Sequence, residues 1–156
     1  QEETMDTTPE MVTLTATPAI AIRTQLGPAE LPAFFGRAFG ELAACARDQI
    51  AGPPFARYHR ADASGFDVEA VMPVRAPVAV AGRVAALALA GGPAVQIKHV
   101  GPYDQLMPTY AALDRWLVEH HRTRSDAVRE VYLTNPADEP DPADWVTLVI
   151  QPVAAA

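Results

Sequence analysis

Two polar side chains near the end of the sequence could do chemistry together. Glu130 and Tyr132 lie two positions apart in the segment REVYL, which is rich in residues that favour β-strands. Side chains two apart on a strand leave the same face, so a carboxylate and a phenol point in one direction. A desolvated carboxylate among aromatic rings is costly unless it is paired, and it is a good receptor for a cation. A simpler interpretation stays open, in which Glu130 lies on an exposed edge strand or binds Arg129 or another arginine.

Aromatic residues elsewhere could complete such a site. Trp145 opens the strand that follows, within cross-strand reach of Glu130 if the two strands form a hairpin. Tyr103, in a Gly-Pro-Tyr turn, is placed either at a pocket rim or in ordinary packing. Tyr110 falls on the apolar stripe of a predicted helix, which favours a core position. Phe55 is a further candidate ligand contact.

Other constellations are weak, and we predict no metal and no cofactor. His120 and His121 are adjacent rather than one helical turn apart, so they form no metal pair on one helix face. His59 and His99 are isolated and are predicted to be structural. The acidic loop 138–144 lacks the spacing and the glycine of a calcium loop. No G-x-S-x-G nucleophile motif and no phosphate-binding glycine loop is present.

The composition of the sequence restricts the classes of protein to which the chain could belong. The formal net charge is −7 with a single lysine, which argues against a nucleic-acid surface. No apolar run reaches the roughly 18 to 20 residues of a membrane span, and we expect no membrane association. The first twenty residues contain acids and threonines rather than the basic and apolar regions of a signal peptide. With one cysteine, Cys45, no internal disulfide forms, and we expect a cytoplasmic protein.

The sequence contains an internal repeat. Residues 22–46 and 97–121 share a plan in which Leu26-Gly27-Pro28 matches Val100-Gly101-Pro102 at an offset of 74 positions. The same offset places Tyr58 on Tyr132, which adds Tyr58 to the candidate ligand contacts. After a longer loop, FDVEAVMPV in the first copy falls on WVTLVIQPV in the second. We therefore predict a flexible segment 1–11 and a single ligand-binding domain 12–153, made of repeat one (12–74), a strand-rich linker (75–93) and repeat two (94–153).

Each copy has the pattern strand, helix, strand, strand. The opening strands are predicted at 12–25 and 94–100, and each ends at a Gly-Pro turn. Asp104 is placed to cap the second helix, whose first turn tolerates Pro108. The helix stripes are predicted as Phe35, Ala38, Phe39 and Leu42 in the first copy, and Leu106, Tyr110, Leu113 and Leu117 in the second. The expected fold is α+β, with two βαββ repeats about a pseudo-twofold axis, an antiparallel sheet with two helices, and a ligand groove between the halves.

The second repeat resembles a known family. HVGPYDQLMPTYAALDRWLVEHH followed by REVYLTNPADEPDPADWVTLVIQPV is similar to the GyrI-like domain, the effector-binding module found alone or behind MerR-type and AraC-type DNA-binding domains. The resemblance spans residues 12–153. It implies a SOUL-like fold of two βαββ repeats and a pocket for lipophilic, often cationic, aromatic compounds. Because no helix-turn-helix lies in these residues, we expect no direct nucleic-acid binding, but fusion to or association with a DNA-binding domain.

The resemblance also implies roles for residues. In multidrug-binding members a buried glutamate lies at the base of a pocket walled by aromatic rings, and the matching positions here are Glu130 and Trp145, with Tyr132 alongside. We expect a receptor. The alternative is a hydrolase that opens cyclopropane rings of DNA-alkylating natural products, with Glu130 as acid and base and Tyr132 polarising the substrate. A protein-interaction role, as in gyrase-inhibiting members, is a third possibility. Arg129 and Leu148 depart from the family pattern.

Overall fold

The chain divides into two structural units, and each contains a strand, a helix and two further strands in that order. The computed structural model describes residues 8–134 and 138–155. Unit one is Thr15–Gly91, and unit two is Gln1–Leu14 with Gly92–Ala156. Each unit is built from antiparallel strands and one long helix, so the predicted α+β class is confirmed. The pseudo-twofold axis and the groove between the repeats stay predictions.

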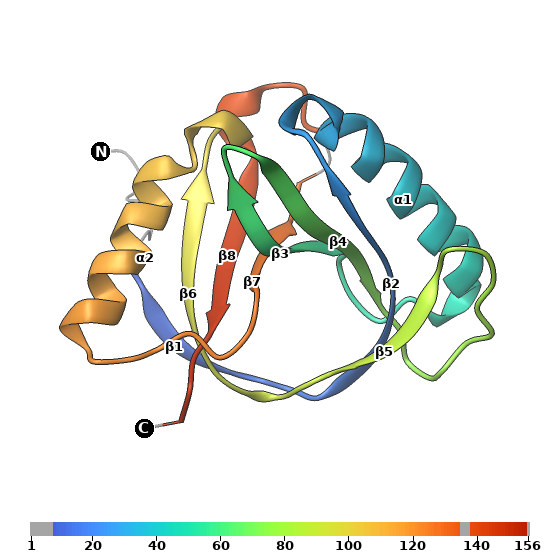
Figure 1. Cartoon of the computed structure of the whole chain (residues 1–156), viewed down its shortest axis with the longest axis horizontal. Helices are drawn as coiled ribbons and strands as arrows, with labels where there is room; N and C mark the ends of the chain where they lie inside the picture. Colours follow the sequence, from blue (N-terminus) through green and yellow to red (C-terminus); the bar gives the residue numbers. More distant parts are fainter. Residues whose placement is uncertain (1–7, 135–137, 156) are drawn as a thin grey trace. The chain divides into compact units, whose positions relative to one another are not determined.

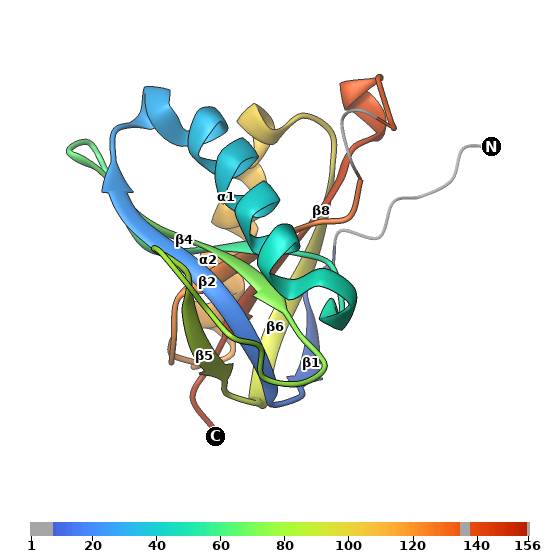
Figure 2. The ribbon, with the colours of Figure 1, turned by 90° about the vertical axis from the view of Figure 1, so that its right-hand side faces the viewer.

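In unit one the strands lie in the order β3-β4-β2-β5 (Figures 1 and 2). The elements are β2 (Thr17–Leu26), α1 (Leu31–Ala46), β3 (Phe55–Asp62), β4 (Gly65–Pro73) and β5 (Ala85–Leu89), with short 3-10 turns η1 (Pro28–Glu30) and η2 (Arg47–Gln49). Strand β2 pairs with β4 on one side and with β5 on the other. The helix packs on β4 and β2. The order strand, helix, strand, strand is the one the repeat predicted.

Unit two repeats this plan, with the strand order β1-β6-β8-β7. Its elements are β1 (Glu10–Leu14), β6 (Gly92–Val100), α2 (Met107–Glu119), β7 (Val128–Tyr132) and β8 (Val146–Pro152), with 3-10 turns η3 (Tyr103–Gln105) and η4 (Pro142–Asp144). Helix α2 lies against β6 (Figure 1). The core between helix and sheet contains seven buried residues: Val95, Ile97, Leu106, Leu113, Leu117, Val149 and Val153.

The two edge strands differ from the prediction. The single opening strand expected at 12–25 is two strands, and β1 pairs with β6 of unit two while β2 stays in unit one. Glu10 and Met11, expected in a flexible segment, belong to β1, whereas residues 1–7 of that segment lie outside the described residues. The strand-rich linker contains β5, which pairs with β2. Local β-propensity marks residues as extended but does not choose the partner strand, which depends on long-range pairing.

The buried face of α1 and the N-terminal cap of α2 also differ from the prediction. Helix α1 buries Phe34, Ala38, Leu42 and Ala46, so Phe34 takes the core position predicted for Phe35. Phe35 and Phe39 are only half-buried. The predicted cap is wrong as well, because Asp104 lies in η3 and Leu106 caps α2 without a side-chain hydrogen bond. Pro108 does lie in the first turn of α2. Of the predicted stripe, Leu113 and Leu117 of α2 and the cap residue Leu106 are buried, and Tyr110 is half-buried. No helix in the described parts of the chain is long and apolar enough to cross a membrane.

The turn before β4 in unit one needs a glycine at position 65. Gly65 has a φ of +132°, and a Cβ there would lie 2.7 Å from the carbonyl oxygen of Leu26. Gly92 has nearly the same φ, +134°, but open space around the Cβ position. We expect Gly65→Ala to lower the free energy of unfolding by about 2 kcal/mol and Gly92→Ala by about 1 kcal/mol, because only the first adds a clash to the strain. Urea denaturation of both variants measures their free energies of unfolding. If both variants lose the same amount, the contact of the added methyl group with the Leu26 carbonyl has no energetic cost.

Candidate functional site

The register of unit two directs Glu130 toward helix α2. Residues directly opposite in a sheet share a face, and Glu130 lies opposite Val149 while Tyr132 lies opposite Thr147. Val149 belongs to the core under α2. The predicted common face of Glu130 and Tyr132 is therefore the helix-covered face of the sheet. Glu130 is 7% exposed, which contradicts the simpler interpretation of a surface carboxylate.

Two phenol groups hold the Glu130 carboxylate. The Tyr110 hydroxyl, from α2, donates a hydrogen bond to Oε2 at 2.5 Å, and the Tyr132 hydroxyl donates to Oε1 at 2.9 Å. The ring of Tyr110 packs against the core of unit two, as its helical position predicted. Its contact with Glu130 was missed by sequence reasoning. A buried tyrosine hydroxyl needs a hydrogen-bond partner, and that requirement could have indicated the pair.

The charge of Glu130 is only partly compensated. Burial raises the pKa of Glu130 above its usual value, and the hydrogen bonds from Tyr110 and Tyr132, together with the nearby imidazole of His99, oppose that shift. Both bonded donors are neutral. The ionised carboxylate therefore has two hydrogen bonds but no salt bridge among the described residues.

Three aromatic rings form a cluster that includes Tyr132, one of the two phenols bonded to this carboxylate. The ring of Tyr103 lies 4.6 Å from that of Trp145 and 5.4 Å from that of Tyr132, centre to centre. Trp145 is fixed by its indole Nε1, which donates to the carbonyl of Glu139 at 2.7 Å. The Gly101 amide donates to the Trp145 carbonyl at 2.8 Å and ties the turn before Tyr103 to the start of β8. The four predicted residues of repeat two thus lie together in one unit, and we call Tyr103, Tyr110, Glu130, Tyr132 and Trp145 the glutamate site.

A buried histidine supports this end of unit two. His99 is 7% exposed, and its Nε2 lies 3.0 Å from the carbonyl oxygen of Pro102. Its Nδ1 lies 3.3 Å from the hydroxyl of Thr109 on α2. These contacts link β6, the turn before Tyr103 and α2, consistent with the structural role predicted for His99. The ring nevertheless lies close enough to Glu130 to favour its charged form, which sequence reasoning missed.

The two predicted contacts from repeat one belong to unit one. Phe55 is buried in β3. The Tyr58 ring lies 6.5 Å from that of Phe35 and 6.0 Å from that of Phe66. The described ring contacts of Tyr58 are thus within its own unit, and a role for Phe55 and Tyr58 in ligand binding stays a prediction.

A second buried carboxylate lies in unit one and has a different environment. Glu69, 7% exposed, accepts from Arg57 at 2.7 Å and lies 2.9 Å from Nε2 of His59. His59 is the extra residue where the β3–β4 register shifts between Tyr58 and Arg60. The bulge brings the His59 side chain to the same carboxylate as Arg57. His59, predicted to be isolated, is therefore part of an ion-paired cluster.

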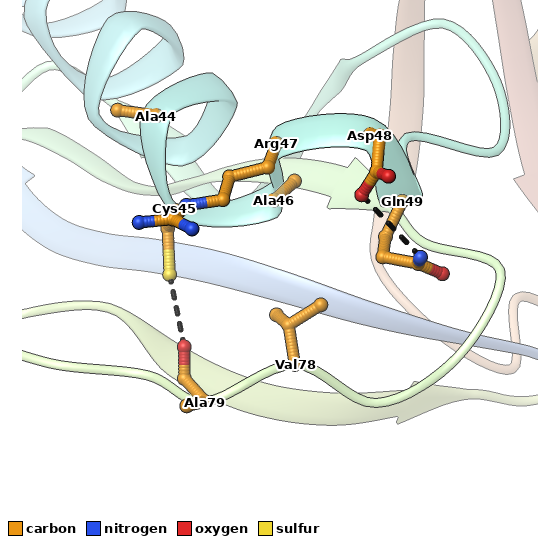
Figure 3. Close-up of a pocket in the computed structure, with 8 residues that line it drawn as sticks. All are labelled: Ala44, Cys45, Ala46, Arg47, Asp48, Gln49, Val78 and Ala79. Carbon is orange, nitrogen blue, oxygen red and sulfur yellow. Dashed lines mark hydrogen bonds between the residues drawn. The ribbon is translucent and has the colours of Figure 1, made fainter.

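Two hollows of the surface are lined by residues outside the glutamate site. Figure 3 shows one in unit one, with a volume of about 530 Å³, where the Cys45 thiol donates to the carbonyl of Ala79 at 3.3 Å. It is lined by Ala44, Cys45, Ala46, Arg47, Asp48, Gln49, Val78 and Ala79. Across residues 8–134 and 138–155, no three histidine, cysteine or acidic side chains come together as metal ligands.

Solved structures with the same fold cover nearly the whole chain. The EcmrR–DNA complex matches with a TM-score of 0.85 and 20% identity over 95% of this chain and 57% of that one. A hydrolase from Listeria innocua matches with a TM-score of 0.72 and 16% identity, over 96% and 93% of the two chains. SAV2435 bound to tetraphenylphosphonium matches with a TM-score of 0.63 and 12% identity, over 94% of each chain. These identities show the fold alone.

Sequence comparison identifies the family. None of the curated proteins matches the sequence. This chain spans little more than half of the EcmrR chain that it matches in the DNA complex. The family model of the GyrI-like small molecule binding domain matches residues 7–154, nearly the full length. The chain therefore belongs to the GyrI-like small molecule binding domain family.

Proposed function

We propose that this small-molecule-binding domain is a receptor for lipophilic, cationic aromatic compounds and that Glu130 is their counter-ion. The observation that carries the proposal is a carboxylate, 7% exposed, whose described hydrogen-bond donors are two neutral phenols. A buried charge without an opposite charge is unfavourable in the free protein. A bound cation would supply that opposite charge, so part of the binding free energy would come from compensating the buried carboxylate.

The rings beside the carboxylate suit an aromatic cation. The faces of tyrosine and tryptophan attract a cation within about 6 Å of the ring centre, and flat ligands stack on them. Tyr103, Tyr132 and Trp145 offer three such rings, and the ring of Tyr103 contacts the other two. Because Glu130 is almost fully covered, a ligand that touches it must turn at least one ring aside. Tyr103, in a 3-10 turn rather than in a strand or long helix, is the ring we expect to move.

Two of the similar structures fit this function. SAV2435 is described bound to tetraphenylphosphonium, a lipophilic aromatic cation, and EcmrR is described in complex with DNA. By this likeness we propose that the domain acts as an effector-binding module, fused to or associated with a DNA-binding domain. In that arrangement the ligand would report to the DNA-binding part, and the chain described here would not contact DNA itself.

A second candidate function is hydrolysis, and one observation favours it. Burial raises the pKa of Glu130, which moves the carboxyl toward the range in which it both accepts and donates protons near neutral pH. In a cyclopropane-bearing alkylator, Glu130 would take a proton from water as the water oxygen bonds to one ring carbon. The ring C–C bond would break, and the proton would pass to the leaving carbon or its conjugated carbonyl, polarised by Tyr132. One similar structure is a hydrolase.

A single titration separates the two functions. We expect tetraphenylphosphonium and cationic dyes to quench the tryptophan fluorescence saturably, because Trp145 lies in the ring cluster. Mass spectrometry should recover every ligand unchanged. Trp116, which is stacked on His120 at the end of α2, also fluoresces. Trp145→Phe and Trp116→Phe therefore form a matched pair, and the quenching should be lost only in the first. A water adduct of a cyclopropane-bearing alkylator, formed only when Glu130 is intact, would overturn the receptor in favour of the hydrolase.

A further inference from the structure

One buried hydroxyl next to the glutamate site has no hydrogen-bond partner among the described residues. Thr147 lies in β8, directly opposite His99 on one neighbouring strand and Tyr132 on the other. Its side chain is 0% exposed. Its Oγ1 makes no hydrogen bond within the described parts of the chain. Buried polar groups have hydrogen-bond partners in most proteins, so the unpaired hydroxyl of Thr147 needs an explanation.

The neighbouring polar groups are already engaged elsewhere. The two nitrogens of His99 face the Pro102 carbonyl and the Thr109 hydroxyl. The hydroxyl of Tyr132 donates to Glu130. The Thr147 hydroxyl therefore stands among satisfied groups, on the same sheet face as the Glu130 carboxylate.

The spacing suits one ligand group that contacts both side chains. Thr147 is opposite Tyr132, and Glu130 is two residues from Tyr132, so Thr147 and Glu130 are diagonal neighbours across β7 and β8. Such neighbours have Cα atoms about 7 to 8 Å apart, and their side chains border the same volume above the sheet. A carboxylate oxygen has two lone pairs, so each oxygen of Glu130 can accept another hydrogen bond beyond the one from its tyrosine.

Resting on the proposed function, we infer that Thr147 is a specificity-determining residue and that the site selects protonated amines over quaternary cations. An ammonium group with several N–H donors satisfies Glu130 and the Thr147 hydroxyl at once. A quaternary ammonium or a phosphonium has no N–H, so it gains only charge attraction and ring contacts, and it leaves Thr147 unpaired. A site with a buried acceptor discriminates strongly against a ligand that does not satisfy it.

The test compares naphthylmethylamine with its trimethylammonium analogue, which carry the same ring and the same charge. By calorimetry we expect the native chain to bind the amine at least about tenfold more tightly, because the Thr147 hydroxyl alone adds one hydrogen bond to a charged group. Thr147→Val keeps the branched shape and removes the hydroxyl. It should weaken the amine about tenfold and leave the quaternary ligand within about twofold. An amine preference that Thr147→Val leaves undiminished would overturn the inference.

Controls keep this inference apart from the proposed function. Thr109→Val removes another buried hydroxyl of the same unit, one that is already paired with His99, and should leave the amine preference unchanged. If Glu130→Gln fails to weaken either ligand, the counter-ion function itself is wrong. In the free chain, Thr147→Val should raise Tm by about 2 to 4 °C, because it removes an unpaired hydroxyl. A fall in Tm would mean that the hydroxyl has a partner in the free protein, which contradicts the inference.

Discussion

Glu130→Gln is expected to weaken the binding of tetraphenylphosphonium by more than about tenfold, or 1.4 kcal/mol. The variant keeps the size of the side chain, and its amide oxygen can accept a hydrogen bond from one of the two phenols, Tyr110 or Tyr132, while its NH2 group can donate to the oxygen of the other. What it removes is the negative charge that faces the cation. Calorimetry or fluorescence titration at neutral pH measures the loss.

The pH dependence of binding provides an independent check on the same charge. Because burial raises the pKa of Glu130, a larger share of the native side chain is protonated at mildly acidic pH than for an exposed glutamate. Cation affinity should therefore rise as the pH rises through that pKa, and binding should release protons. Glu130→Gln should show neither effect.

A control removes the same charge at a distance from the site. Glu41 is an exposed carboxylate on α1, paired with Arg83 at 2.8 Å. Glu41→Gln changes the net charge of the chain by the same amount, and we expect it to leave affinity within about twofold, since exposed charges are screened. If both variants weaken binding equally, the overall charge of the protein rather than Glu130 attracts the ligand.

The sequence predicted the shared face of Glu130 and Tyr132, which local strand geometry decides. The two-residue period of a strand placed Glu130 and Tyr132 on one face, and the register with Thr147 and Val149 shows that this face is covered by α2. The repeat predicted the order of elements in both units. The sequence pattern did not predict the strand pairing between distant segments. It did not indicate that β1 pairs with β6 or that β5 pairs with β2.

Residues whose role depends on a partner were the ones missed. Tyr110 has the spacing of a core residue, and only the position of its hydroxyl reveals the bond to Glu130. The choice between Phe34 and Phe35 is a small rotation of α1, which a stripe of adjacent apolar residues leaves open. Glu69 was not singled out from the sequence, because its ion-paired cluster depends on the β3 bulge, which brings His59 and Arg57 to the same carboxylate.

The contrast between the two buried glutamates explains why one of them is the candidate receptor group. Glu69 and Glu130 are equally covered, at 7% exposure each. Glu69 faces the guanidinium of Arg57, so its charge is neutralised within the protein. Glu130 faces two phenols, which hold a carboxylate in place without neutralising it. A charge that is already paired has little to gain from a ligand, whereas a charge that is only hydrogen-bonded has much to gain.

The same substitution at these two positions should therefore change stability in opposite directions. At neutral pH we expect Glu69→Gln to lower the free energy of unfolding by about 3 kcal/mol, because it leaves the largely buried guanidinium of Arg57 without its carboxylate. Glu130→Gln should raise the free energy of unfolding, because the folded chain no longer buries a charge that lacks an opposite partner. Urea denaturation of both variants at neutral pH measures the pair.

The raised pKa of Glu130 determines how the free energy of unfolding changes with pH. The folded-state pKa is raised, so between the unfolded value and the folded value the native chain binds more protons than the unfolded chain. The free energy of unfolding then falls as pH rises through that window. Wild type should match Glu130→Gln most closely at about pH 4 and be less stable than it at about pH 8. If Glu130→Gln is the less stable protein at about pH 8, an opposite charge already neutralises Glu130 in the free chain, and the carboxylate is a structural group like Glu69 rather than a receptor for a cation.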